Sequence, residues 1–198
     1  RVPIELPPEM DEFLDSLALM AGGCDLPDED TPLGRLTREF FGNNWGTCRD
    51  GLLARTQRIR VRPDASPWPR VFQFEIDCPF KRKLGPEHPV ELMPGPIRGT
   101  ILYRPDLFRN PHEPALAVRL PRGQAYFHPN YSRTLGLVCL GDVPPGPFPL
   151  DALLENHLYP ILSYQNRRPS HPADFESARY FALDPEAMSG LEPVRPLY

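Results

Sequence analysis

The sequence predicts a single α+β domain in which a four-stranded antiparallel meander packs on helices. Four runs rich in β-branched and aromatic residues lie between positions 52 and 120, and such runs are typical of strands. Helical spacing of apolar residues precedes and follows them. At 198 residues, with 40% apolar and 24% charged side chains, the chain is long enough to bury one core.

Composition argues against several classes of protein. The formal net charge of −4 is too small to indicate a nucleic-acid partner. No apolar run reaches membrane-spanning length, and no signal-peptide pattern is visible. The four cysteines are scattered without a Cys-x-x-Cys spacing, which argues against a zinc site and a disulfide framework. We therefore expect a cytoplasmic protein that needs no metal and no cofactor.

Residues 1–30 form an acidic extension, and residues 31–198 form the domain. The extension holds nine acids and one arginine, whereas residues 51–133 hold fourteen basic and seven acidic residues. Its apolar residues are spaced for a short helix that ends at Gly22-Gly23; they are Met10, Phe13, Leu14, Leu17 and Met20. This helix either docks on its own domain or is a detachable segment that binds a partner or the protein's own basic surface.

The domain is predicted to open with a short helix. Thr31 supplies a capping hydroxyl and Pro32 occupies the first helical position. Leu33, Leu36 and Phe40 then form an apolar stripe. The sequence Gly42-Asn43-Asn44 is expected to end the helix.

The four predicted strands cover residues 52–61, 70–76, 99–103 and 115–120. The turn between the first two contains Ser66-Pro67-Trp68-Pro69, and a proline-rich loop separates the last two. Residues 78–96 are rich in proline and look like an insertion, to which the sequence assigns no role.

Two further helices follow the strands. Residues 150–164 have an apolar face that is typical of a core helix, although Pro160 should kink or interrupt it. His157 lies on that face and is interpreted as a core histidine. Residues 174–181 are predicted to form the last helix, with Phe175, Ala178 and Phe181 on one side.

The candidate chemistry lies between the strands and these helices. His128-Pro129-Asn130 precedes Cys139, which Gly136 and Gly141 bracket. A lone cysteine is often a small buried hydrophobe, but this combination favours a nucleophile on an irregular, accessible loop. An asparagine amide such as that of Asn130 can stabilise an oxyanion.

Together these segments resemble the core of ubiquitin-conjugating enzymes. That family carries a His-Pro-Asn turn, a short loop and a Gly-x-(Ile/Val)-Cys-Leu segment, which here is Gly136 to Leu140. The likeness is clearest over residues 98–180. It implies the UBC-like fold, a scaffold role for His128 and Pro129, and a role for Asn130 in stabilising an oxyanion or holding the loop. It also implies that the helix beginning at Pro32 is where an activating enzyme docks.

The chain departs from the family pattern at two places near the cysteine. Many members have an aspartate two residues after the cysteine, but here Gly141 intervenes and Asp142 is third. Where members keep an acidic or serine residue just before a proline, this chain has His171, before Pro172. A histidine can accept a proton from an incoming lysine, or His171 can be an exposed loop residue without a role.

The resemblance implies a carrier of a ubiquitin-like modifier. Cys139 would take the modifier from an adenylating activating enzyme as a thioester and pass it to an amine of a target protein. The atypical loops and the high arginine and proline content indicate a bacterial system. Two alternatives stay open. One is a catalytically silent binding module, and the other is a cysteine hydrolase that uses Cys139, Asn130 and either His128 or His171.

Overall fold

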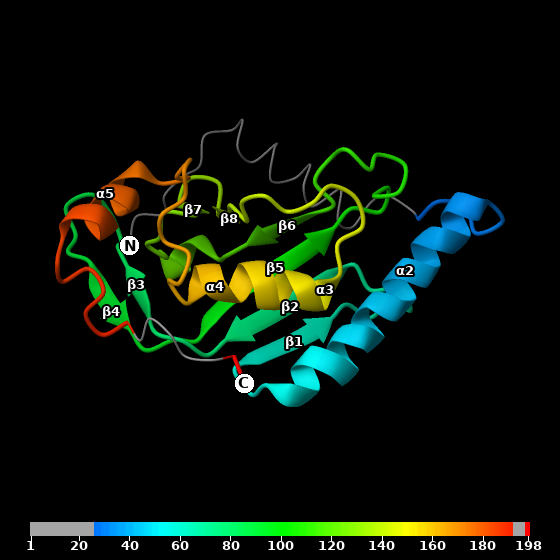
Figure 1. Cartoon of the computed structure of the whole chain (residues 1–198), viewed down its shortest axis with the longest axis horizontal. Coiled ribbons are helices and arrows are strands. Elements are labelled where there is room, and N and C mark those ends of the chain that lie inside the picture. The colour runs from blue at the N-terminus through cyan, green and yellow to red at the C-terminus, as the bar shows by residue number, and fades with distance from the viewer. Residues whose placement is uncertain (1–25, 192–196) are drawn as a thin grey trace.

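The structure is a computed structural model that describes residues 26–191 and 197–198, and it confirms the α+β class (Figure 1). Its main sheet has six antiparallel strands in the order β1-β2-β5-β6-β8-β7. These are β1 (Ile59–Pro63), β2 (Val71–Ile76), β5 (Ile97–Tyr103), β6 (Leu116–Arg119), β7 (Tyr131–Ser132) and β8 (Leu137–Val138). A separate hairpin pairs β3 (Phe80–Arg82) with β4 (Glu91–Met93).

The prediction of four strands was wrong in number, although the meander itself is present as β1, β2, β5 and β6. The two additional strands are only two residues long each. They are too short to give an alternating sequence pattern, and they form because the chain folds back on itself between Tyr131 and Val138. The segment before the cysteine is therefore part of the sheet.

The first helix begins as predicted but extends further. The Thr31 hydroxyl caps α2 (Pro32–Cys48) by accepting a hydrogen bond from the Gly34 amide. The helix continues past Gly42 and through a π-helical turn, η1 (Arg49–Leu53). Asn44, predicted to end it, is buried instead, and its side-chain oxygen accepts the Leu150 amide at 2.7 Å. This tertiary contact outweighs the weak helix propensity of the sequence.

The longer helix also corrects the start of the first strand. Residues 52–53 belong to η1, and β1 begins only at Ile59. Leu52 lies in η1, and its side chain is buried in the core. The other predicted strands coincide with β2, β5 and β6 to within about two residues, the precision to which such boundaries are defined.

The later helices cover one face of the sheet. A continuous helical segment is formed by α3 (Leu150–Leu153), the π-helical turn η3 (Leu154–Leu158) and α4 (Tyr159–Leu162). The π-helical turn interrupts the α-helix just before Pro160, the residue predicted to kink or interrupt it. The last helix, α5 (Phe175–Leu183), is capped by Asp174 and confirms the prediction.

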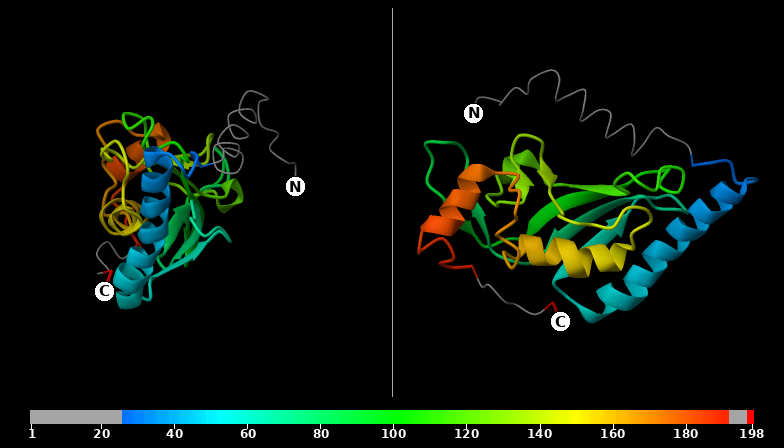
Figure 2. Two further views of the ribbon diagram at one scale, coloured as in Figure 1. Left: turned by 90° about the vertical axis from the view of Figure 1, so that its right-hand side faces the viewer. Right: turned by 45° about the horizontal axis from the view of Figure 1, so that its top comes forward.

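Figure 2 shows α2 and the α3–α4 segment on one side of the sheet, with α5 at its far end. The core lies between these helices and the inner sheet face, to which Phe72, Ile101 and Val118 contribute. Neither α2, α3, α4 nor α5 lies on the opposite face, which we call the outer face.

Residues 78–96, to which no role was assigned, form the β3–β4 hairpin. The hairpin forms backbone contacts with the two residues that precede the His-Pro-Asn turn. Arg82 pairs with Tyr126, and the Phe127 amide donates to the Lys81 carbonyl at 2.9 Å. The predicted helix around Met10 to Met20 lies outside the described residues.

Candidate functional site

Cys139 follows directly after β8 and is exposed as a free thiol. The hairpin formed by β7 and β8 brings it back beside the His-Pro-Asn turn. Gly136 and Gly141 have φ values of 69° and 73°. Such values are unfavourable for other residues, so these glycines allow the tight path on both sides of the cysteine.

Two hydrogen bonds join Cys139 to Asn130. The Cys139 amide donates to the Asn130 carbonyl at 2.6 Å, and the Asn130 side-chain amide donates to the Cys139 carbonyl at 3.3 Å. Asn130 is only 1% exposed. An asparagine amide has two N–H groups, so one remains for another acceptor. Asn130 therefore holds the loop and keeps a donor next to the thiol's backbone.

His128 is buried as part of the scaffold. Its ring stacks on Tyr126 and contacts Tyr164 edge-on, with centroid distances of 5.6 and 4.7 Å. Its Nδ1 accepts the Asn130 amide at 2.9 Å. Burial lowers the pKa of His128 from 6.5 to about 3, because a charged ring loses its hydration there. The ring is therefore neutral at physiological pH.

The Pro129 carbonyl connects the turn to the loop before α5. It accepts hydrogen bonds from the amides of Ala173 at 2.7 Å and Asp174 at 3.2 Å. Arg133, directly after β7, forms ion pairs with Asp174 and Glu176 at the start of α5. The turn, the hairpin and the last helix are thereby fixed relative to one another.

Asp142 and His171 are placed differently. Both are exposed, and within the described part of the chain no hydrogen bond links either of them to Cys139 or Asn130. His171 lies two residues before Ala173, so its loop is attached to the turn. Its Nδ1 lies 3.2 Å from the Ser170 hydroxyl. The structure thus brings together Asn130, Pro129 and Cys139, and leaves Asp142 and His171 on the adjoining surface.

Two other cysteines show the contrast with Cys139. Cys48 and Cys78 are buried in the core. Burial raises the pKa of the Cys48 thiol to about 12, so it is protonated and unreactive at neutral pH. Of the three cysteines in the described part of the chain, only Cys139 is accessible to another protein.

His157 contacts the site in a way the sequence did not indicate. It is half-buried, with Nδ1 3.4 Å from the Leu140 carbonyl, directly after the cysteine. Its ring packs edge-on against Phe148. The helical pattern placed it on the apolar face, and nothing in that pattern distinguishes it from a core histidine.

An open, mainly apolar groove of about 370 Å³ lies beside the segment around Cys139. Its lining includes residues of β6, His112 and Pro114 from the preceding loop, and Leu140, Gly141 and Val143.

Within residues 26–191 and 197–198, no group of three or more His, Cys, Asp or Glu side chains is arranged to hold a metal ion. No helix in the same ranges is both long and apolar enough to cross a membrane. The chain matches no protein-family model, and no curated protein is significantly similar to it.

Proposed function

We propose that the chain is a UBC-like conjugating enzyme that carries a ubiquitin-like modifier as a thioester on Cys139. The domain would span residues 31–198, and the protein would act in the cytoplasm. Its partners would be the modifier, an adenylating activating enzyme and a target protein.

One observation carries the proposal. The backbone of a cysteine with an exposed thiol is held by two hydrogen bonds to the buried asparagine of a His-Pro-Asn turn. Asn130 and Cys139 are nine positions apart in the sequence, and the fold brings them into direct contact. A cysteine that served only packing would be buried, as Cys48 and Cys78 are.

The chemistry would proceed in two transfers. In the first, the Cys139 thiolate attacks the thioester carbonyl on the activating enzyme, a new thioester forms, and the activating enzyme's thiolate leaves. In the second, a target amine attacks that thioester. The tetrahedral oxyanion collapses to an amide, and the Cys139 thiolate leaves.

Asn130 and the exposed polar residues would serve the second transfer. The remaining N–H of the Asn130 amide is suited to the oxyanion. The amine must also lose a proton, and His171 and Asp142 are the candidate acceptors on the adjoining surface. We assign the modifier's C-terminal tail to the groove between β6 and Leu140.

The cysteine hydrolase is the weaker alternative. A hydrolase needs a base in contact with the thiol. His128 is buried among aromatic rings, and its Nδ1 is occupied by the Asn130 amide. His171 would have to move toward Cys139 to replace it. The silent binding module has no observation in its favour, because the thiol is present and exposed.

The test is a loading assay with candidate modifier, activating enzyme and ATP, followed by electrophoresis with and without reductant. The carrier predicts a modifier-sized adduct that reductant removes. The absence of an adduct with a cognate pair that charges its own activating enzyme would contradict the proposal. Release of modifier from a fusion substrate, without ATP, would favour the hydrolase instead.

A further inference from the structure

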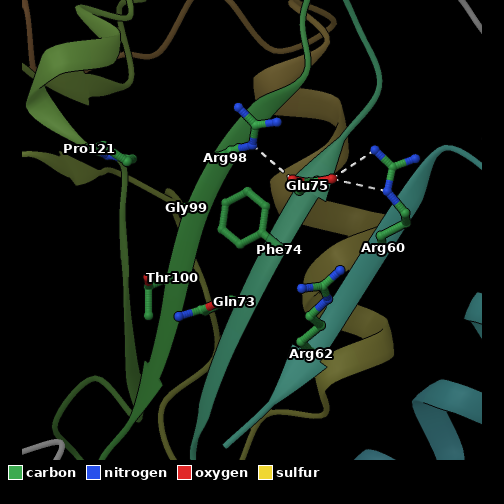
Figure 3. Close-up of a pocket in the computed structure, with 9 residues that line it drawn as sticks. All are labelled: Arg60, Arg62, Gln73, Phe74, Glu75, Arg98, Gly99, Thr100 and Pro121. Atoms are coloured by element: carbon green, nitrogen blue, oxygen red, sulfur yellow. Dashed lines mark hydrogen bonds and ion pairs between the residues drawn. The ribbon is translucent and has the colours of Figure 1, made fainter.

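The outer face of the sheet carries a concentration of arginines that the proposed chemistry does not use. We call these residues the arginine face; they are Arg60 and Arg62 of β1, Arg98 of β5, Arg119 of β6, and Arg122 just beyond β6. They line two adjoining hollows that share Thr100 and Pro121. Figure 3 shows the first hollow, with side chains from β1, β2 and β5.

Strand register arranges four arginines of the arginine face, all but Arg122, in two rows. Arg60, Glu75 and Arg98 are opposite one another on β1, β2 and β5. The second row runs across four strands through Arg62, Gln73, Thr100 and Arg119. Because side chains alternate between the two faces of a strand, both rows point away from the core.

The two rows differ in how their charge is balanced. Glu75 forms ion pairs with both Arg60 and Arg98 at 2.8 Å. These interactions lower the pKa of Glu75 to about 2, so its charge persists at physiological pH. In the second row, Arg62 and Arg119 form no ion pair with any residue that the structure describes. Among the described residues that line the hollows, Glu75 alone is acidic.

We propose that the acidic arm, residues 1–25, docks on the arginine face of its own chain. The arm contains six acidic residues and one arginine. Its acids would supply the carboxylates that the second row lacks, and charge complementarity of this kind selects and orients partners. The proposal does not depend on thioester chemistry at Cys139.

The point where the arm joins the domain supports an intramolecular contact. The Pro27 carbonyl accepts a hydrogen bond from Arg38 at 2.7 Å, and the Arg38 guanidinium lies over the Trp68 ring at 4.9 Å. Trp68 is in the turn between β1 and β2, and Arg62 is one pair inward from the Pro63–Phe72 pair at that end. An extended chain covers about 3.3 Å per residue, so the arm is long enough to reach both rows.

Paramagnetic relaxation in the full chain tests this contact. A nitroxide is attached to Ser16→Cys, with Cys24 and Cys139 changed to alanine and the buried Cys48 and Cys78 retained. We expect selective loss of amide signal intensity at residues 60–62, 73–75 and 98–100, with α5 unaffected. Raising the salt from about 0.1 M to about 1 M shortens the Debye length from about 10 Å to about 3 Å and should restore the signals.

Matched charge reversals identify the surface. Arg62→Glu with Arg119→Glu should restore the signals at low salt. Arg109→Glu with Arg179→Glu makes the same change of charge at two exposed positions elsewhere and should leave the loss intact. If the reversal unfolds the domain, the arm is neutralised instead by changing Glu9 and Glu12 to glutamine and Asp11 and Asp15 to asparagine.

Three results would overturn the proposal. One is that the spin-labelled chain without charge reversals shows no signal loss, or the same loss at all residues. Another is a loss that persists in both the arginine-face reversal and the neutralised arm. The third comes from mixing isotope-labelled chains without nitroxide with unlabelled, spin-labelled chains. Signal loss at the arginine face of the isotope-labelled chains in that mixture would assign the contact to a second copy.

Discussion

The two sides of Cys139 are built differently. On one side, Asn130 is buried and makes both hydrogen bonds that join it to the cysteine backbone. On the other side, Asp142 and His171 are exposed on loops, without a hydrogen bond to Cys139 in the described structure. The fold therefore fixes the position of Asn130 before any partner binds. The side chains of Asp142 and His171 can change conformation when a partner binds.

This difference separates two parts of the proposed chemistry. Forming and holding a thioester needs an accessible thiol and a rigid loop, which the folded chain has before any partner arrives. Activating an amine needs a base at a position that the amine itself defines. We therefore expect substitutions on the buried side to have larger effects than those on the exposed side.

The largest effect is expected from Cys139→Ala, which should abolish the reductant-sensitive adduct. Cys139→Ser should replace the labile thioester by a longer-lived ester that survives reductant. Neither variant should change the melting temperature much, because the side chain is exposed. The measurement is the loading gel, with Cys48→Ala as the matched control. An adduct that persists in Cys139→Ala would mean that another thiol is the nucleophile.

Asn130→Ala should come second, and it should impair discharge to an amine more than loading. Loss of an oxyanion donor costs on the order of 10²–10³ in rate, whereas the activating enzyme supports the loading step with its own site. Single-turnover discharge of preloaded protein to free lysine measures this. Effects smaller than about threefold on both steps would reduce Asn130 to holding the loop.

His128 should make stability depend on pH. Its pKa is about 3 in the folded chain against 6.5 when unperturbed, so below about pH 6.5 the unfolded chain binds a proton that the folded chain does not. Stability should therefore fall as pH decreases, by up to about 1.4 kcal/mol per pH unit for this one group. Urea unfolding at pH 7, 6 and 5 measures the slope.

His128→Asn is the control for that slope, since its side-chain oxygen can still accept the Asn130 amide. This variant should be less stable at pH 7, because a ring packed against Tyr126 and Tyr164 is lost. Its stability should vary less with pH than that of the wild type. Parallel curves for the two proteins would show that His128 does not carry the pH dependence.

The smallest effect is expected on the exposed side, at His171. If His171 accepts the lysine proton, His171→Gln should slow discharge to free lysine and change its pH profile relative to the wild type. Loading should be unchanged, and His171→Asp should retain partial activity. Single-turnover discharge across pH compares the variants. A profile shared with the wild type would direct attention to Asp142 or to water.

The sequence predicted those parts of the fold that have local signals. Thr31-Pro32 marked the start of α2, and Asp174 marked the start of α5. The sequence-based prediction was wrong where contacts between residues far apart in the chain determine the structure. The helix passes Asn44 because that side chain caps the Leu150 amide more than one hundred positions away, and β7 and β8 exist only as a pair.

The candidate site also has a part that the sequence predicted and a part that it did not. A motif could associate Asn130 with Cys139, and the structure places them in contact. The motif could not indicate that His157 faces the Leu140 carbonyl, because an apolar helical stripe signals only burial. Nor could it position His171, whose exposed loop is attached to the turn through the amides of Ala173 and Asp174.

The two hydrogen bonds accepted by the Pro129 carbonyl also bear on the order of events during synthesis. Their donors, Ala173 and Asp174, leave the ribosome well after the thiol at position 139. Chains emerge from their N-terminal end, at about 5–20 residues per second. A nascent chain therefore exposes its cysteine for seconds before the turn beside it is complete. Until then the Pro129 carbonyl lacks its two hydrogen bonds, and the site around the thiol is complete only after Ala173 and Asp174 have emerged.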